Sequence, residues 1–274
     1  MSGRCSGAGI IVIRKKTYKV FFRLVRCAVE QLVLSDETVD DLQNGYSIIQ
    51  KKHSFRYGVD AVLLADFADI KRRHSVIDLG TGTGVIPILI YARRKPSEIT
   101  AVEIQKEMAD MAERSIRLNG LEKSIQVLCM DLKDAPMLLG KARYDCVVTN
   151  PPYMKKECGI NNPSETKAIA RFEIMCSLKE LLIAARELLK PGGKLFMVHR
   201  TDRLADIIYE MRDKGIEPKR IRFVHPSIGR RPNLLLIEGA RGGNKELRFM
   251  DPLYIHNEKG EYTEEIHRIY GRRI

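Results

Sequence analysis

The sequence lacks several patterns that define common classes of protein. Its six histidines and six cysteines show no spacing typical of a metal site, and no Cys-x-x-Cys pair occurs. There is no Gly-x-Ser-x-Gly elbow for acyl transfer and no Gly-Lys-Ser/Thr of a P-loop. No apolar run approaches the length of a membrane span. We therefore expect a protein without a metal centre or a membrane anchor.

The composition is that of a globular protein, with 44% hydrophobic and 30% charged residues among 274. Cys129 and Cys146 lie inside apolar, strand-like runs, which is typical of reduced thiols in a cytosolic protein. Met1–Ala8 is small and polar, and Ile10–Ile13 is too short for the core of a signal peptide. We expect a cytoplasmic protein that works as a monomer.

The formal net charge of +12 suggests an anionic partner such as nucleic acid. Half of this excess lies in residues 1–31, which hold seven basic residues and one acidic residue. That segment is either a basic arm that binds RNA or a poorly ordered, even spurious, extension. We expect the extension, followed by a single domain over residues 32–274 with a lead-in at 35–74 and a tail at 241–274.

From residue 75 onward, apolar segments alternate with helical patterns, which is typical of a parallel sheet with helices on its faces. Two late segments are joined by a short link without a helix, which predicts an antiparallel hairpin at the end of the sheet. The predicted strands span residues 75–77, 99–102, 124–130, 144–149, 194–199, 221–225 and 234–238. The predicted helices span residues 85–91, 106–118, 173–189 and 204–214, with one after Asp60 as N-cap and one after Thr263 as N-cap. We therefore expect an α/β fold with a seven-stranded, mostly parallel, doubly wound sheet.

A glycine-rich turn follows the first strand of this sheet, in Asp78-Leu79-Gly80-Thr81-Gly82-Thr83-Gly84. Glycines allow a tight turn and let a ligand approach the backbone at a helix N-terminus. Val85 stands where the dinucleotide fingerprint needs glycine, which argues against nicotinamide or flavin. Glu103 lies nineteen residues after Gly84, where a doubly wound sheet places a carboxylate for the hydroxyls of a ribose.

Two more polar side chains follow the next strands along the chain. Asp131 comes after the third strand and either accepts from an adenine amino group or forms a turn. Asn150 comes after the fourth strand. Because ligands of open α/β sheets bind beyond the carboxyl ends of the strands, four polar strand ends in succession predict a binding site.

The fourth strand ends in Asn150-Pro151-Pro152-Tyr153, in which two prolines forbid a helix. By itself the sequence also fits an ordinary strand-ending turn. As part of a site, the amide oxygen of Asn150 and the carbonyl of Pro151 can accept hydrogen bonds from the donor group of a ligand. The ring of Tyr153 offers a flat face on which a planar group can stack. Asn is no general base, so catalysis would rest on positioning and polarisation.

With these motifs, the chain resembles the Rossmann-like S-adenosylmethionine-dependent methyltransferases that modify exocyclic amino groups. Residues 36–270 resemble most closely the bacterial tRNA1(Val) adenine-37 N6-methyltransferases, which act next to the anticodon. The supporting segments are Phe55–Ala65, Ala170–Glu173, Asp251–Tyr254 and Tyr262-Thr263.

The resemblance implies S-adenosyl-L-methionine as cofactor and tRNA as substrate. The residues expected to bind the cofactor are Asp78, Gly80, Thr81, Gly82, Gly84, Glu103, Ile104, Asp131, Leu132 and Asn150. The residues expected at the reacting amine are Asn150, Pro151, Pro152 and Tyr153. The residues expected to contact tRNA are Tyr153, Lys155, Lys156, Arg171, Arg230 and Arg231. The basic residues in this set could equally form a solvated face.

The same strand-end motif occurs in enzymes that methylate a glutamine amide of release factors, DNA adenine or guanine N2 of rRNA. A glutamine-directed enzyme usually carries a larger N-terminal helical domain, which residues 35–75 are too few to supply. DNA methylases generally carry a sizeable target-recognition domain. A non-enzymatic module that binds the cofactor or RNA is the remaining alternative, which a transfer assay separates.

Overall fold

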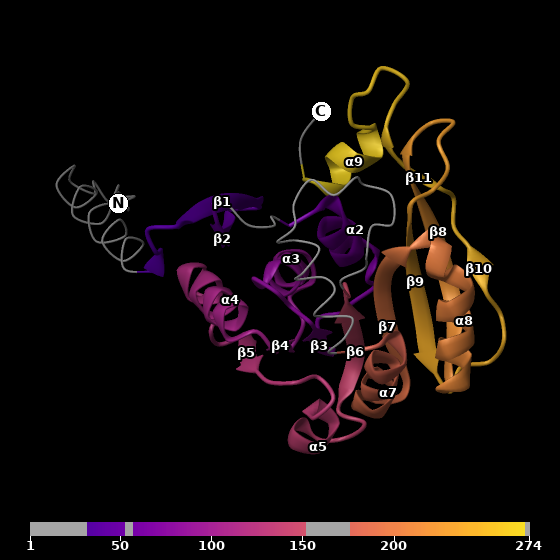
Figure 1. Cartoon of the computed structure of the whole chain (residues 1–274), viewed down its shortest axis with the longest axis horizontal. Helices are drawn as coiled ribbons and strands as arrows, with labels where there is room; N and C mark the ends of the chain where they lie inside the picture. The colour runs from indigo at the N-terminus through magenta and orange to yellow at the C-terminus, as the bar shows by residue number, and fades with distance from the viewer. Residues whose placement is uncertain (1–31, 53–56, 152–175, 272–274) are drawn as a thin grey trace, which may run out of the picture. The chain divides into compact units, whose positions relative to one another are not determined.

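The structure is a computed structural model that describes residues 32–52, 57–151 and 176–271 (Figure 1). Pro152, Tyr153, Lys155, Lys156 and Arg171 lie outside the described residues, as does the segment 1–31. Predictions that concern them remain predictions. The unit described below spans Asp36–Ile274.

The centre of this unit is a nine-stranded sheet in the order β10-β8-β9-β7-β6-β3-β4-β5, with β11 also paired to β8. The strands are β3 (Ser75–Leu79), β4 (Glu98–Glu103), β5 (Ile125–Cys129), β6 (Tyr144–Thr149), β7 (Leu189–Arg200), β8 (Ile216–Ser227), β9 (Leu234–Arg241), β10 (Arg248–Phe249) and β11 (Leu253–His256). Strands β3 to β7 are parallel, whereas β9 is antiparallel to both β7 and β8. The predicted mostly parallel sheet with an antiparallel hairpin is confirmed, and β10 and β11 add two short strands beyond the seven predicted.

Helices cover both faces of the sheet, as its two-sided apolar strands require. The helices are α2 (Val59–Phe67), α3 (Val85–Arg94), α4 (Lys106–Leu118), α5 (Ala135–Leu139), α7 (Leu178–Leu188), α8 (Leu204–Asp213) and α9 (Glu264–Ile269), with a 3-10 turn at Thr201–Arg203. Neighbouring strand residues alternate between two apolar clusters. Val148 packs with α2 and α3, for example, while Val147 packs with α7 and α8.

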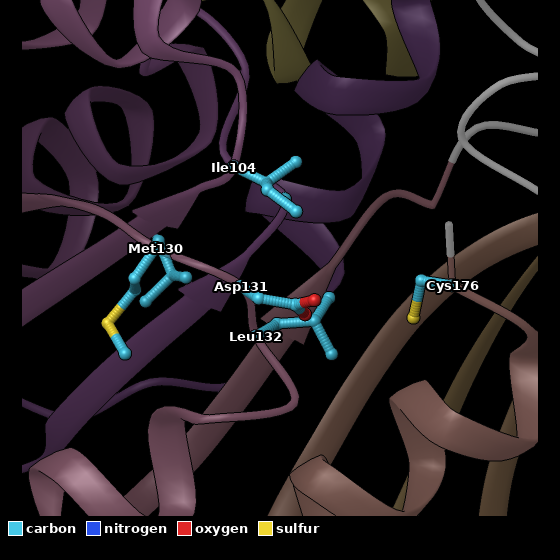
Figure 2. A pocket seen from close by; sticks show the side chains of 7 residues that line it. Ile104, Met130, Asp131, Leu132 and Cys176 are labelled. Atoms are coloured by element: carbon cyan, nitrogen blue, oxygen red, sulfur yellow. The ribbon is translucent and has the colours of Figure 1, made fainter.

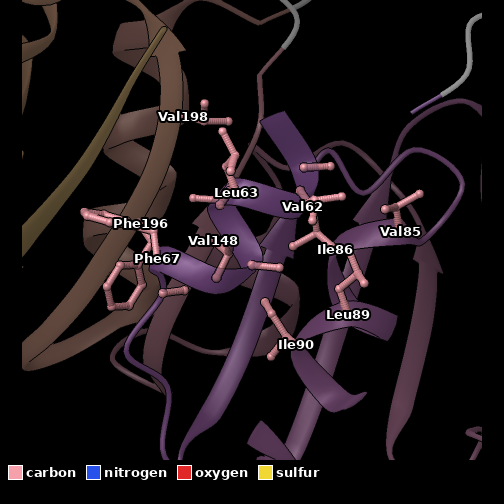
Figure 3. Close-up of a cluster of buried hydrophobic side chains, with 14 of the residues drawn as sticks. Val62, Leu63, Phe67, Val85, Ile86, Leu89, Ile90, Val148, Phe196 and Val198 are labelled. Atoms are coloured by element: carbon pink, nitrogen blue, oxygen red, sulfur yellow. The ribbon is translucent and has the colours of Figure 1, made fainter. Parts of the chain in front are cut away.

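The cluster under α2 and α3 is shown in Figure 3. There the ring of Phe67 at the end of α2 meets that of Phe196 in β7 edge to face, with centroids 6.3 Å apart. Val62 and Leu63 of α2 pack between Val198 of β7 and α3. This packing fixes α2 against the parallel strands, so the N-terminal end of α2 has a defined place at the edge of the sheet.

A separate hairpin of β1 (Glu37–Gln43) and β2 (Tyr46–Lys51) precedes this core. Its turn has positive φ at Asn44 and Gly45, as the sequence Asn-Gly predicts. The backbone of β2 is bound by two polar side chains at the C-terminal end of α4. Asn119, the C-cap residue, contacts both the N–H and the C=O of Ser47, and the hydroxyl of Ser115 accepts from Ile49 N. These two residues therefore satisfy backbone groups of an otherwise open strand edge.

Two predictions about helix starts are wrong. Asp60 is not an N-cap, because α2 begins at Val59 with Gly58 in the cap position. Helix α7 begins at Leu178 rather than at residue 173, after a capping box in which Ser177 and Glu180 exchange hydrogen bonds. The predicted N-cap at Thr263 is confirmed by its hydroxyl, which accepts from Ile266 N at 3.4 Å.

Candidate active site

The glycine-rich turn leaves β3 and leads into α3 at the carboxyl edge of the sheet. Gly80, Gly82 and Gly84 all have positive φ, of 78°, 57° and 89°. A side chain at Gly84 would also press on the Cβ of Ala112, at 3.3 Å, whereas Gly82 faces open space. The turn therefore needs glycine for its backbone, and at Gly82 it leaves that backbone accessible to a ligand.

Glu103, at the end of β4, is only 3% exposed and is bound to the glycine turn. Its Oε2 accepts from Gly82 N and its Oε1 from Gln105 N, each at 2.9 Å. These bonds hold the carboxylate in one orientation. Each oxygen keeps a second lone pair, so the group can still accept from a pair of hydroxyls.

Asp78, in β3 directly before the turn, is completely buried. Burial raises its pKa to about 7, and the nearby Glu103 carboxylate adds to this effect, while Thr81 acts in the opposite direction. Within the described residues, neither oxygen of Asp78 nor the hydroxyl of Thr81 has a hydrogen-bond partner. A buried acceptor left in this way beside an open glycine turn fits a ligand that brings a positive charge or hydrogen-bond donors.

A narrow pocket lies between the ends of β3, β4 and β5 (Figure 2). Its wall is mostly apolar, with Ile104 across from Leu132. Asp131 is beside Leu132 and is held by Lys133, whose N–H donates to Oδ1 at 2.9 Å and whose ammonium lies 3.3 Å from Oδ2. An apolar slot with one carboxylate at its rim suits a flat ring that carries an amino group.

Three residues of this pocket were not predicted from the sequence: Val102, Met130 and Cys176. Val102 and Met130 belong to predicted strands, so their place beside strand ends could have been inferred. Cys176 comes from the segment before α7, far along the chain, and no sequence pattern marks it. Burial raises the pKa of its thiol to about 11, so the thiol is neutral at physiological pH.

The end of β6 is fixed next to the end of β3. The hydroxyl of Thr149, which is fully buried, donates to Leu79 O at 2.8 Å. Asn150 follows directly, and its amide nitrogen Nδ2 donates to Oδ2 of Asp60, at the start of α2, over 3.2 Å. Pro151 continues the chain as irregular backbone. The amide of Asn150 is thus held at the same edge of the sheet as the glycine turn.

The predicted strand-end residues therefore come together. Strands β6, β3, β4 and β5 are consecutive neighbours, so their carboxyl ends present Asn150, Asp78, Glu103 and Asp131 along one edge. The chain crosses from β5 back to β6 on the other side of β3, which places the topological switch point between β3 and β6. Ligands of doubly wound sheets bind at such a point.

Arg230 and Arg231 are exposed in the turn between β8 and β9. Because Arg200 at the end of β7 pairs with Leu234 at the start of β9, this turn lies at the same edge of the sheet as Asn150. Strands β7 and β6 stand between β9 and the pocket, which begins at β3, and adjacent strands are about 4.8 Å apart. The two arginines are therefore displaced sideways from the pocket and can meet only a large ligand.

Neither a metal centre nor a membrane span emerges from the part of the chain that the structure describes. No group of three or more His, Cys, Asp or Glu side chains in these ranges could hold a metal ion. None of the helices within the same ranges is long and apolar enough to cross a membrane.

Comparison with known proteins identifies this arrangement. The family model described as "Methyltransferase small domain" matches residues 58–211, from the start of α2 into α8. A protein of Porphyromonas gingivalis named "tRNA1(Val) (adenine(37)-N6)-methyltransferase" is 29% identical over 82% of this chain and 90% of its own length. A protein of Parabacteroides distasonis with the same name is 30% identical over 70% of this chain and 80% of its own length.

Solved structures share the fold. A protein of Agrobacterium tumefaciens described as a predicted O-methyltransferase has a TM-score of 0.64 at 24% identity, covering 77% of this chain and 95% of its own. TYW2 of M. jannaschii, solved with AdoMet, has a TM-score of 0.53 at 15% identity, covering 76% and 86%. At these identities the likeness concerns the fold alone.

The fold, the glycine turn and the matching family model define an S-adenosylmethionine-dependent methyltransferase. Within that class, the chain belongs to the family of the tRNA1(Val) (adenine(37)-N6)-methyltransferases, whose sequences align with most of its length.

Proposed function

We propose that the protein methylates the exocyclic N6 amine of an adenine in tRNA, next to the anticodon, at position 37 of a valine tRNA. The observation that carries the proposal is the position of Asn150, whose amide is held at the end of β6 beside the glycine turn. The names of the relatives in Porphyromonas gingivalis and Parabacteroides distasonis support the choice of acceptor.

The residues at the strand ends fit S-adenosylmethionine. Gly80 and Gly82 would pass under its methionine end. The Asp78 carboxylate, which has no hydrogen-bond partner among the described residues, suits the positive charge there. Glu103 would accept from the ribose hydroxyls and Asp131 from the adenine amino group, with the ring between Ile104 and Leu132. Thr81 and Gly84 would complete the turn around the methionine end. When bound, the cofactor supplies a methyl group on a sulfonium centre, which is strongly electrophilic.

The chain's own contribution to transfer is to hold the amine. The lone pair of an aryl amine is delocalised into its ring, which makes it a poor nucleophile. Asn150 Oδ1 and the Pro151 carbonyl would accept its two N–H bonds, which draws the nitrogen toward a pyramidal geometry. Neither group is basic enough to take a proton, so the proton leaves to solvent after transfer. Tyr153 is proposed to stack on the extracted base.

Basic residues near the carboxyl ends of the parallel strands are proposed to contact the rest of the tRNA. Arg230 and Arg231 are exposed there and can bind phosphates of the anticodon arm. Lys155, Lys156 and Arg171 are proposed for the same role. These contacts orient the RNA, whereas the choice of base falls to the site around Asn150.

A parallel transfer assay tests the acceptor. The protein is incubated with labelled S-adenosylmethionine and, separately, unmodified tRNA, release factor, DNA and rRNA. We expect label to appear only in tRNA. A valine tRNA transcript in which adenine 37 is replaced by guanine should not be labelled. Label confined to release factor would instead assign the glutamine-N5 activity, and label confined to rRNA the guanine-N2 activity. Absence of label from every acceptor, with the cofactor bound, would leave a binding module.

A further inference from the structure

The amide of Asn150 can face its surroundings in two ways, and only one is useful for holding an amine. With Oδ1 toward the substrate, the side chain accepts an N–H bond. With Nδ2 toward the substrate, it offers donors to a group that is itself a donor. Something must therefore select the orientation of this amide.

Asp60 determines the orientation of the Asn150 amide. Its Oδ2 lies 3.2 Å from Asn150 Nδ2, across ninety residues of sequence. Since an ionised carboxylate can only accept hydrogen bonds, the atom that faces it must be the amide nitrogen. Oδ1 of Asn150 is left facing elsewhere and has no donor within the described part of the chain.

Asp60 itself is fixed by its place in α2. It lies in the first turn of the helix, where the helix dipole favours a negative charge. Its Oδ1 accepts from Ala61 N at 3.0 Å, and its Oδ2 accepts from Asn150 Nδ2. The packing of Val62 and Leu63 under the same helix holds this end of α2 in place.

The glycine at position 58 is a second, independent observation: it leaves room for the Asp60 carboxylate. Its φ and ψ of −94° and 174° suit any residue, so the backbone does not require glycine. A Cβ at this position, however, would lie 2.5 Å from Asp60 Oδ1. Any larger residue at position 58 must displace the carboxylate that faces Asn150.

We propose that Asp60 is a positioning residue that orients the Asn150 amide with its oxygen toward the substrate amine. Asp60 does not act as the base for the reaction, and the proposed effect on transfer passes through its hydrogen bond with Asn150. The proposal rests on the proposed function, in which Asn150 holds the amine. It predicts that the two residues act as one unit.

Methylation kinetics with tRNA as substrate test whether Asp60 and Asn150 act as one unit. We expect Asp60→Ala to lower kcat by about 100-fold, as for a reacting group held in the wrong geometry. Asp60→Asn keeps an acceptor oxygen and should restore kcat to within about fivefold of the wild type. Asp60→Ala/Asn150→Ala should be no slower than Asn150→Ala alone, because neither change matters once the other is made. Binding of S-adenosylhomocysteine, measured by calorimetry, should change by less than about threefold.

Gly58→Ala tests the same contact with the carboxylate still present. It should lower kcat, and it should add nothing in the Asp60→Ala background. Asp69→Ala, an exposed carboxylate shortly after α2, is the matched control and should leave kcat unchanged. Thermal unfolding of each variant separates a loss of positioning from a loss of folding.

An NMR measurement tests the contact between Asp60 and Asn150 without any substrate. The side-chain NH2 signals of Asn150, identified by their loss in Asn150→Ala, should shift in Asp60→Ala and stay in place in Asp69→Ala. If the wild type fails to methylate tRNA, the proposed function fails while this shift still supports the Asp60 contact. The positioning role is overturned if the signals do not move, if the kinetic effects of Asp60→Ala and Asn150→Ala multiply, or if Asp60→Ala weakens cofactor binding while kcat is kept.

Discussion

Arg114 of α4 and Glu37 of β1 form a two-pronged ion pair in which the glutamate side chain is completely buried. Nη1 and Nη2 of Arg114 lie 2.6 and 2.8 Å from the two carboxylate oxygens, and Nε binds Asp110 at 2.8 Å. Glu37 raises the pKa of the guanidinium above its already high value. The pair ties the first hairpin to a helix of the main sheet.

Breaking this pair should be costly. We expect Arg114→Ala to lower the free energy of unfolding by about 3–5 kcal/mol, because it removes both hydrogen bonds that the guanidinium gives to a buried carboxylate. Urea denaturation measures the change. Arg117→Ala, which removes the exposed pair with Glu113 on the same helix, should cost no more than about 1 kcal/mol. Equal effects of the two changes would contradict the structural role given to Glu37.

Asp78 should make stability depend on pH. Its pKa of about 7 in the folded protein lies above the unfolded value, so the folded state holds the extra proton between pH 4 and 7. Stability of the cofactor-free protein should therefore fall as pH rises through this window. Asp78→Asn should remove the fall and stabilise the protein at pH 8 by up to about 3–4 kcal/mol. Urea denaturation at pH 5 and pH 8 tests this, with the exposed Asp134→Asn as the control that should keep the wild-type pH profile.

Glu103 should govern cofactor affinity. Glu103→Gln places an amide N–H group against the backbone N–H of Gly82 or Gln105, so it disturbs the turn as well as the proposed site for the ribose. We expect binding of S-adenosylhomocysteine to weaken by about 10- to 100-fold, the effect of losing one or two charge-assisted hydrogen bonds. Titration calorimetry measures it. Glu122→Gln, exposed before β5, should bind as the wild type does, and unchanged affinity in Glu103→Gln would remove Glu103 from the cofactor site.

Asn150 should matter for transfer and little for cofactor binding. Asn150→Ala is expected to lower kcat by at least about 100-fold, the cost of removing one placed polar group from a transition state. Its affinity for S-adenosylhomocysteine should stay within about threefold of the wild type, since the proposed cofactor contacts lie mainly at the ends of β3 to β5. The exposed Asn244→Ala serves as control. Retained turnover in Asn150→Ala would rule out the amine-holding mechanism.

Arg230 and Arg231 should contribute through charge. Arg230→Ala/Arg231→Ala is expected to raise KM for tRNA and to reduce the slope of log affinity against log salt by about one to two. Kinetics at several salt concentrations measure both. Arg72→Ala/Arg73→Ala is the matched control, because these exposed arginines precede β3 at the opposite edge of the sheet. Equal effects of the two pairs would indicate a diffuse attraction without a defined contact.

Local sequence patterns predicted the parts of the site that depend on one strand end at a time. Asp78, Glu103, Asp131 and Asn150 each end an apolar run, and parallel strands bring such ends to one edge. The contact between Asn150 and Asp60 could not be predicted in this way. It joins a strand end to a helix start ninety residues away, and locally Asp60 looks like a helix cap.

The ends of helices and strands were harder to predict from the sequence than the presence of the strands. The next strand was predicted to begin at residue 194, after Lys190-Pro191-Gly192-Gly193, yet β7 already begins at Leu189. The pairing with β6 shifts between Tyr144 and Cys146, which absorbs the glycines as an irregularity within the strand. The helix predicted over residues 173–189 is described as α7 from Leu178 to Leu188, and the capping box of Ser177 and Glu180 marks its start.

The short strands β10 and β11 give the C-terminal segment a protective role. Both pair with the outer side of β8, a strand of twelve residues that would otherwise end the sheet with open backbone groups. Long uncovered edges recruit strands from other molecules and lead to aggregation. Residues after Arg241 therefore act as a cover, and a protein cut there should associate through β8.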